Sequence, residues 1–382
     1  MSAENADVIV IGDGVIGLST AFELGRGGVR CSVFGAVNHG AASGAAAGLL
    51  APSIGKLRPD VKTFFDASLA LYPAWVDELR QYEPELTLLE GLLDVSFLIP
   101  SSPSAIPKLI PSAPSVIPSA PSVIPSAPSV IPSGARDRFL SADDVSRLEP
   151  GVSPRRAVFY PNDGAIDNGL LVRALRRAVA SSPSCTLSSD DPVISIDLAS
   201  GARIRTQSGA VHEAERLIIA AGAWSPHVTG LPRQLPVVPL KGQMLAVRST
   251  ALQHAVMGDA IYLVPRRDEI VIGATAEHAG FDTTVAPESI EALRRAAIEL
   301  VPALADAPIT RTWAGIRPAT PDMLPILGPD PSSNRLLYAC GHSKNGILLA
   351  PATAISIAAF ATGDEVPLDV SPFSVRRFLT AE

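Results

Sequence analysis

The sequence predicts an α/β fold in which a Rossmann-like domain interleaves with an α+β domain that contains an antiparallel sheet. The chain opens with a buried strand over 8–11, a glycine-rich turn, a helix over 18–25 and a second strand over 31–34. A further buried apolar run, over 216–220, ends in a turn of small residues. Because parallel-type elements lie at both ends and in the middle of the chain, with antiparallel-looking strands between them, two interleaved domains fit better than two successive ones.

The first turn has the GxGxxG pattern of a dinucleotide-binding βαβ unit, since it follows a strand, starts a helix and returns to a strand. Gly12 permits the tight turn, Gly14 lets the backbone approach a pyrophosphate, and Gly17 lets the helix and strand pack closely. Val15 and Ile16 lie in the same turn, where the helix directs its free N–H groups at the phosphates. The alternative is a glycine-rich turn in an α/β protein that binds no dinucleotide.

One part of that pattern is missing from this chain. An acidic residue at the end of the second strand normally accepts a hydrogen bond from the adenosine ribose, but Gly35 stands there, and no Asp or Glu occurs between Glu23 and Asp60. Losing one charge-assisted hydrogen bond costs about 1.5–3 kcal/mol of affinity, so we expect Gly35→Glu to tighten binding. Asn38 or a backbone carbonyl could supply the acceptor instead. Asp13 adds negative charge near the pyrophosphate unless its side chain points away.

The bulk composition excludes several classes of protein. The 382 residues suffice for two domains, and the 31 basic residues are scattered in a chain of net charge −7, so no nucleic-acid surface is expected. Three cysteines without a CxxC pair and six histidines without ligand spacing predict neither a disulfide framework nor a metal site. The polar N-terminus is unlike a signal peptide, and the apolar stretch over 346–361 is too short to span a bilayer. We expect a soluble cytoplasmic protein that binds no membrane.

Residues 98–133 carry a repeat of seven residues, with VIPSAPS present at 116–122 and again at 123–129. A proline at every third or fourth position removes backbone donors, which excludes a helix and a central strand. Polyproline II or disorder is therefore expected. Two interpretations stay open: a proline-rich ligand for a partner domain, or an expanded surface loop without a role. The near-identical copies suit recent duplication and favour the loop.

Periodic apolar patterns place the other elements. Further helices are predicted over 61–79, 141–148, 168–180, 287–300 and 347–360. Further strands are predicted over 91–97, 192–197, 202–206, 243–247, 260–264 and 269–272.

Three loops consist mainly of small residues, over 41–48, 220–225 and 341–346. Small residues allow a ligand to approach the backbone closely. The third loop leads into a helix, whose N-terminus favours an anion or a carbonyl oxygen. Together with the first turn, these loops indicate one large flat ligand that is held mainly by backbone.

The same loops belong to longer strings through which the chain resembles the D-amino-acid-oxidase-like FAD-dependent oxidoreductases, and among them most closely the glycine oxidases. The resemblance covers almost the whole chain outside 98–133. Its particular matches are AASGAAAGLLAP at 41–52, AAGAWS at 220–225, PLKGQMLAVR at 239–248, IYLVPRRDEIVIGATAEHAGFD at 261–282, WAGIRPATPDMLPILGP at 313–329 and GHSKNGILLAPATA at 341–354.

The resemblance implies an FAD-binding domain made of three chain segments and a substrate domain whose antiparallel sheet covers the flavin ring. The FAD-binding domain takes residues 1–80, 150–228 and 314–382, and the substrate domain takes 81–149 and 229–313, with 98–133 as a proline-rich loop. The cofactor contacts it implies are Gly12, Gly14, Val15, Ile16, Gly17, Ala42, Ser43, Ala46, Ala47, Gly48, Leu49, Val193, Ala221, Gly222, Trp224, His342, Lys344, Asn345, Gly346, Ile347 and Leu348.

By the same resemblance, Tyr262 and Arg317 are the residues that hold the substrate. The fork of Arg317, in what we expect to be a GIRPAT turn, matches a carboxylate, and Tyr262 adds a neutral donor. No cysteine stands in the segment 313–316, where some relatives tether the flavin, so noncovalent FAD is expected. Lys344 stands where many relatives carry arginine, which loses the bidentate fork.

The implied reaction is FAD-dependent oxidative deamination of glycine and other small amines or D-amino acids. Hydride passes from the substrate Cα to the flavin, the imine hydrolyses, and O2 reoxidises the flavin to give H2O2. The imine could also serve thiazole assembly in thiamine synthesis. Two alternatives stay open: a flavin dehydrogenase that uses a quinone, and a catalytically silent homologue with weakened FAD binding. Relatives of this kind commonly form homo-oligomers, so one is expected here.

Overall fold

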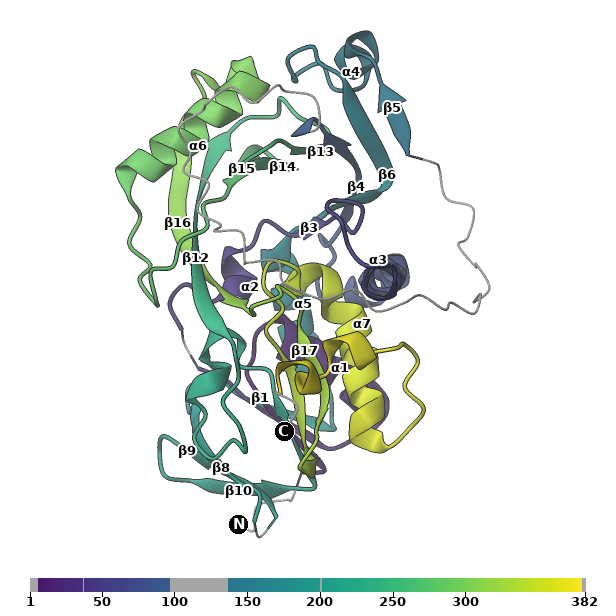
Figure 1. Ribbon diagram of the computed structural model, residues 1–382, viewed down its shortest axis with the longest axis vertical. Helices are drawn as coiled ribbons and strands as arrows, with labels where there is room; N and C mark the ends of the chain where they lie inside the picture. Colours follow the sequence, from purple (N-terminus) through teal and green to yellow (C-terminus); the bar gives the residue numbers. More distant parts are fainter. Residues whose placement is uncertain (1–5, 37, 97–136, 200, 380–382) are drawn as a thin grey trace.

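The computed structural model describes residues 6–36, 38–96, 137–199 and 201–379. The proline-rich tract predicted over 98–133 lies outside these residues. Figure 1 shows two main sheets, one above the other in this view, with a small third sheet near the N-terminus.

A six-stranded sheet contains the predicted βαβ unit. Its neighbours are parallel except for the antiparallel pair of β17 and β18 at one edge. In spatial order, its strands are β17 (Ile326–Asp330), β18 (Ser333–Cys340), β11 (Arg216–Ile219), β1 (Val8–Ile11), β2 (Cys31–Phe34) and β7 (Cys185–Ser188).

Strand β1 is buried on both faces, as an all-apolar parallel strand should be. Val8 and Val10 pack with the helices, while Ile9 and Ile11 face a small antiparallel sheet. The helices on the first face are α1 (Val15–Arg26), α3 (Pro59–Leu79), α5 (Asn168–Ser181) and α7 (Gly346–Thr362). The small sheet consists of β8 (Val193–Asp197), β9 (Ala202–Thr206) and β10 (Val211–Ala214).

A nine-stranded, mainly antiparallel sheet forms the second layer and arches over the first in Figure 1. In spatial order, its strands are β16 (Ile309–Ala319), β12 (Val238–Arg248), β15 (Glu269–Gly273), β14 (Tyr262–Arg266), β13 (Ala255–Met257), β4 (Leu88–Asp94), β6 (Ala157–Ile166) and β3 (Leu49–Leu50), with β5 (Arg138–Leu140) paired to β6.

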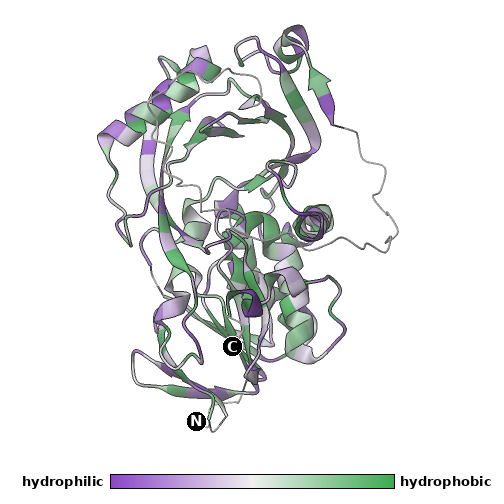
Figure 2. Cartoon of the chain, viewed as in Figure 1, coloured by the Kyte–Doolittle hydropathy of each residue, from purple (hydrophilic) through white to green (hydrophobic). Residues whose placement is uncertain are grey.

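Helix α6 (Pro287–Leu300) lies on the outer side of this sheet. Its buried residues Ile290, Leu293, Ala297 and Leu300 recur at helical spacing and pack into one cluster with the strands. Figure 2 shows the result as hydrophobic strands beneath a helix of mixed hydropathy. The remaining helices are α2 (Ala42–Ala45), α4 (Ala142–Leu148), η2 (Gly222–His227), η3 (Pro302–Leu304), η4 (Ser371–Phe373) and η5 (Val375–Phe378).

The predicted helices are all present, with ends that differ by at most three residues. The longest strands that were not predicted are β6 and β16. Strand β6 contains Pro161, Asn162 and Gly164, which are typical of turns. The expected GIRPAT turn is wrong, because Arg317 and Pro318 lie within β16. This strand forms the sheet edge, where a proline without an N–H is tolerated.

The domain boundaries stay a prediction. Strands β3 and β6 pair with the nine-stranded sheet although they lie in segments assigned to the FAD-binding domain. Cys31 and Cys185, far apart in the sequence, are register partners in β2 and β7, and both are free thiols. Over the described ranges, no helix is long and apolar enough to cross a membrane, and no three His, Cys, Asp or Glu residues form a metal-binding group.

Candidate active site

A cavity of about 1680 Å3 is lined by residues from both main sheets. The predicted site residues gather on its wall, although they come from segments spread over most of the chain. Those that line it are Gly12, Gly14, Val15, Ile16, Ala42, Ser43, Ala46, Ala47, Gly48, Leu49, Val193, Ala221, Gly222, Trp224, Tyr262, Arg317, His342, Lys344, Asn345, Gly346, Ile347 and Leu348.

Gly17 is the predicted cofactor residue that does not line the cavity. A Cβ added there would lie 1.8 Å from the carbonyl oxygen of Gly12 and 3.2 Å from a methyl group of Val10. Gly17 therefore keeps α1 close to β1, as its place in the motif predicts.

Two helix N-termini open on the cavity. Neither α1 nor α7 has a side-chain cap, and neither carries an acidic residue in its first turn. Their first backbone N–H groups and positive dipole ends therefore remain suited to negatively charged groups of a ligand. Of these N–H groups, that of Val15 donates to Ser43 Oγ at 2.9 Å, which joins the first turn to the loop over 41–48.

The loop over 41–48 contains the short helix α2, and long side chains from elsewhere hold its carbonyls. Trp313 Nε1 donates to the carbonyl of Ala45 at 2.9 Å. Arg266 Nη2 donates to the carbonyl of Ala47 at 2.8 Å and to Asn168 Oδ1 at 2.6 Å. These contacts fix a segment whose own side chains are small and provide little packing surface.

The first turn of α7 is held by α3. Pro351 lies inside α7 and has no N–H to bond with the carbonyl four residues earlier, that of Ile347. The buried hydroxyl of Tyr72 donates to that carbonyl instead. Ser68 Oγ donates to the carbonyl of Leu348 at 2.7 Å. The helix therefore keeps its apolar first turn at the cavity in spite of the proline.

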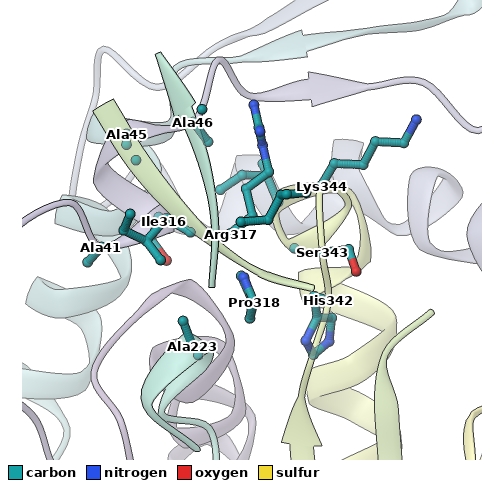
Figure 3. Close-up of a pocket in the computed structure, with 18 of the residues that line it drawn as sticks. Ala41, Ala45, Ala46, Ala223, Ile316, Arg317, Pro318, His342, Ser343 and Lys344 are labelled. Atoms are coloured by element: carbon teal, nitrogen blue, oxygen red, sulfur yellow. The ribbon is translucent and has the colours of Figure 1, made fainter. Parts of the chain in front are cut away.

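His342 is buried, and its Nε2 lies 3.1 Å from the Thr353 hydroxyl of α7. Burial lowers the pKa of this imidazole to about 3, so the ring is neutral at neutral pH. Figure 3 shows His342 directed away from Arg317 and Lys344. It contributes to the cavity as an uncharged wall residue.

Arg317 and Tyr262 come from different strands of the nine-stranded sheet and reach the same cavity. Arg317 Nη1 donates to the carbonyl of Thr275 at 3.0 Å. A Cβ on Gly242 would lie 2.4 Å from the guanidinium, so the absence of a side chain at position 242 leaves room for Arg317. The hydroxyl of Tyr262 lies 3.9 Å from the sulfur of Met244.

Burial and neighbouring charges shift the pKa values of the groups around Arg317 and Tyr262. Burial raises the pKa of the Tyr262 hydroxyl, and the cations Arg317 and Arg266 partly offset that rise. Burial and the charge of Arg317 lower the pKa of Lys344. Figure 3 shows Arg317 and Lys344 extending toward the same side of the cavity, from β16 and from the loop before α7. The site thus offers a neutral hydroxyl beside a permanent cation.

Asp13 does not point away from the cavity. Its Oδ2 accepts a hydrogen bond from Arg176 Nη2 at 2.7 Å, and both residues line the cavity with Ser189. The sequence indicated no role for Arg176 or Ser189, because the ion pair joins residues 163 positions apart. The sequence signal for Arg176 is a cation in the middle of a predicted helix, and Ser189 has none.

A profile of the FAD dependent oxidoreductase family matches residues 7–360. The bifunctional protein ThiO/ThiG of Trichormus variabilis is 35% identical over 97% of this chain and 55% of that protein. The chain spans about half the length of the ThiO/ThiG relatives that it matches. Glycine oxidase of Pseudomonas aeruginosa is 32% identical over 96% of this chain and 98% of its own length.

Among solved structures, glycine oxidase from Geobacillus kaustophilus superposes with a TM-score of 0.84 at 29% identity, covering 98% of this chain and 100% of that one. The Rossmann-like fold and the family resemblance predicted from the sequence are thereby confirmed. The chain belongs to the FAD-dependent oxidoreductase family.

Proposed function

We propose that this protein binds FAD noncovalently and oxidises glycine and other small amines or D-amino acids, with release of an imine or 2-oxo acid, ammonia or an amine, and H2O2. One observation carries the proposal: Arg317 and Tyr262 bring a cation and a hydroxyl group to the same cavity that is lined by glycines and by the uncapped N-termini of α1 and α7. The relatives named glycine oxidase support the same activity.

The glycines of the wall fit a large flat group. A Cβ on Gly44 or Gly222 would meet no atom within 4 Å, and one on Gly14 would meet only Ser43 Oγ, at 3.1 Å. These positions leave backbone exposed for close approach, while the N-termini of α1 and α7 suit a pyrophosphate and an anionic ring edge. The predicted cofactor residues would hold FAD here.

Noncovalent attachment is supported by the chemistry of Cys340, which lines the cavity from β18. Burial raises the pKa of its thiol to about 12. A thiol that stays protonated is a poor nucleophile toward the flavin ring.

When bound, FAD supplies a two-electron acceptor that O2 can reoxidise. The chain supplies orientation: the planar fork of Arg317 binds a substrate carboxylate, and the hydroxyl of Tyr262 donates a second hydrogen bond to it. Because the raised pKa of Tyr262 keeps its proton in place, Tyr262 acts as a donor and not as a base. Lys344 lines the same cavity, where burial and the charge of Arg317 lower its pKa.

The test measures H2O2 release by flavin-saturated protein with each of five substrates: glycine, sarcosine, N-ethylglycine, D-alanine and methylamine. Methylamine is glycine without its carboxylate, so it should be oxidised at least about a hundredfold less efficiently. Equal oxidation of methylamine and glycine would contradict the role of Arg317. Electron transfer to quinones or dyes alone would make the protein a dehydrogenase, and protein that stays colourless with added FAD would be a silent homologue.

We further propose that the imine serves thiazole assembly in thiamine synthesis, which the relatives named ThiO/ThiG support. Deletion of the gene should then create a requirement for thiazole or thiamine, and growth without either would contradict this role. The homo-oligomeric state and the cytoplasmic location stay predictions.

A further inference from the structure

The missing ribose acid at the end of β2 is accompanied by a second departure from the usual pattern. Gly35 lines the cavity directly after β2. A Cβ added to it would lie 2.0 Å from Cγ of Asp13 and 2.3 and 2.4 Å from its two carboxylate oxygens. The carboxylate of Asp13 therefore occupies the space into which a side chain at position 35 would grow.

The surroundings hold this carboxylate in place. Arg176 Nη2 donates to Asp13 Oδ2 at 2.7 Å, and Arg176 Nη1 donates to Ser189 Oγ at 2.6 Å. The side chain of Asp13 is 13% exposed. Within the described part of the chain, no hydrogen bond reaches its other oxygen, Oδ1, so that one acceptor remains available on the wall of the cavity.

We propose that Asp13 replaces the acidic residue missing at position 35 and that its carboxylate accepts a hydrogen bond from the 2′-hydroxyl of the adenosine ribose. Arg176 is the positioning residue, which also neutralises the charge that Asp13 brings near the pyrophosphate. A ribose hydroxyl requires an acceptor and not a particular chain position. This inference rests on the FAD binding of the proposed function, and it removes the reason to expect weakened cofactor capture.

The same geometry corrects the expectation for Gly35→Glu. The new side chain would meet the carboxylate of Asp13, which is held by Arg176, and place two negative charges side by side. We therefore expect this single variant to bind FAD more weakly than the wild type. The double variant Asp13→Ala/Gly35→Glu frees the space and should recover most of the affinity.

The test compares ADP with 2′-deoxy-ADP, which carry the same phosphate charge and differ by one hydroxyl. Equilibrium dialysis of the whole chain measures how strongly each nucleotide displaces bound FAD. The wild type should prefer ADP by about tenfold or more, the value of one charge-assisted hydrogen bond. Asp13→Ala should reduce this preference to about twofold or less, and the double variant should restore it. Asp13→Asn, which keeps the side-chain shape, should lose part of it.

Two variants serve as controls. Asp7→Ala removes an aspartate that is ion-paired with Arg30, away from the cavity, and should keep the full preference. Asn38→Ala removes the other acceptor considered from the sequence and should also keep it. The inference would be overturned if the wild type showed no preference for ADP over 2′-deoxy-ADP. It would also be overturned if Asp13→Ala kept this preference or if Asn38→Ala lost it. No amine is present in this assay, so the inference about Asp13 can hold even if the protein oxidises no amine. A chain that takes up no FAD would overturn both this inference and the proposed function.

Discussion

The two walls of the cavity recognise their ligands by different means. The wall from the six-stranded sheet and its helices is made mainly of small residues and helix N-termini over 12–16, 41–48, 220–224 and 341–348. The wall from the nine-stranded sheet presents side chains such as Leu240, Met244, Tyr262 and Arg317. The first wall presents mainly backbone, with the Asp13–Arg176 pair as an exception, and the second presents side-chain groups.

This difference predicts how each wall responds to substitution. At Gly12 on the backbone wall, and at Gly17 in the helix that follows it, an added atom meets main chain that cannot move without disturbing the sheet. On the side-chain wall, a residue such as Arg317 can be replaced without moving the strand that carries it. The backbone wall should therefore tolerate little change, whereas the side-chain wall can change specificity while the cofactor stays bound.

The largest expected effect comes from Gly17→Ala. Alanine favours a helix by about 1 kcal/mol over glycine, but its Cβ would overlap the Gly12 carbonyl at 1.8 Å. We expect a net loss of about 3 kcal/mol or more in the free energy of unfolding, together with loss of bound flavin. Urea unfolding and the flavin content after purification measure both.

Gly27→Ala is the matched control, since it lies at the end of the same helix and its Cβ would meet its nearest atom at 3.4 Å. This variant should keep wild-type stability and flavin content. Equal stability of the two variants would contradict the rigid-wall interpretation.

The second prediction concerns acid stability, because a buried group with a shifted pKa follows β18 of the six-stranded sheet and another lies in β6 of the nine-stranded sheet. His342 has a folded pKa of about 3, below its unfolded value of about 6.5. Its contribution to stability is present above pH 6.5 and is lost as the pH falls toward 3. Between pH 7 and pH 4 this group costs the wild type roughly 3 kcal/mol of its free energy of unfolding. In urea unfolding, the free energy of unfolding of His342→Gln should therefore fall by less over the same pH range.

Asp163 of β6 should show the opposite dependence. Burial raises its pKa to about 7, although Ser53 donates to it. Its contribution is fully present below pH 3.8 and is lost as the pH rises through 7. Asp163→Asn should therefore be more sensitive to acid than the wild type. Parallel pH curves for the wild type and both variants would contradict the two assignments.

The third prediction tests the side-chain wall. Arg317→Ala removes the proposed partner of the substrate carboxylate and should raise the KM for glycine about a hundredfold, while the flavin spectrum and bound flavin stay unchanged. Arg317→Lys keeps the charge without the fork and should give an intermediate value. If Arg317→Ala released the flavin, the two walls would not be independent.

The smallest expected effect comes from Tyr72→Phe. The carbonyl of Ile347 would lose its donor because Pro351 cannot replace it. A buried carbonyl without a partner costs about 2 kcal/mol, which thermal unfolding would detect. Tyr82→Phe, in a turn after α3 where no hydroxyl bond is described, should change stability by less than about 0.5 kcal/mol. Equal behaviour of the two variants would show that Tyr72 does not support α7.

The elements that the sequence predicted well are those with local signals. The GxGxxG turn, the amphipathic helix over 287–300 and the small-residue loops each carry their pattern within a few residues. Strands β6 and β16 were not predicted from the sequence, because Pro161, Gly164 and Pro318 indicate turns locally. Pairing with β4 and β12 overrides that local preference.

The sequence by itself determined the fold family and the cofactor class, since motif spacing and residue size are local properties. All of the site residues that it singled out, except Gly17, line the cavity. Only the tertiary structure decided how distant groups meet. It brought Asp13 to Arg176 and into the space beside Gly35, and it placed Tyr72 under the first turn of α7. Such contacts depend on side-chain directions across folded layers, which a linear pattern does not encode.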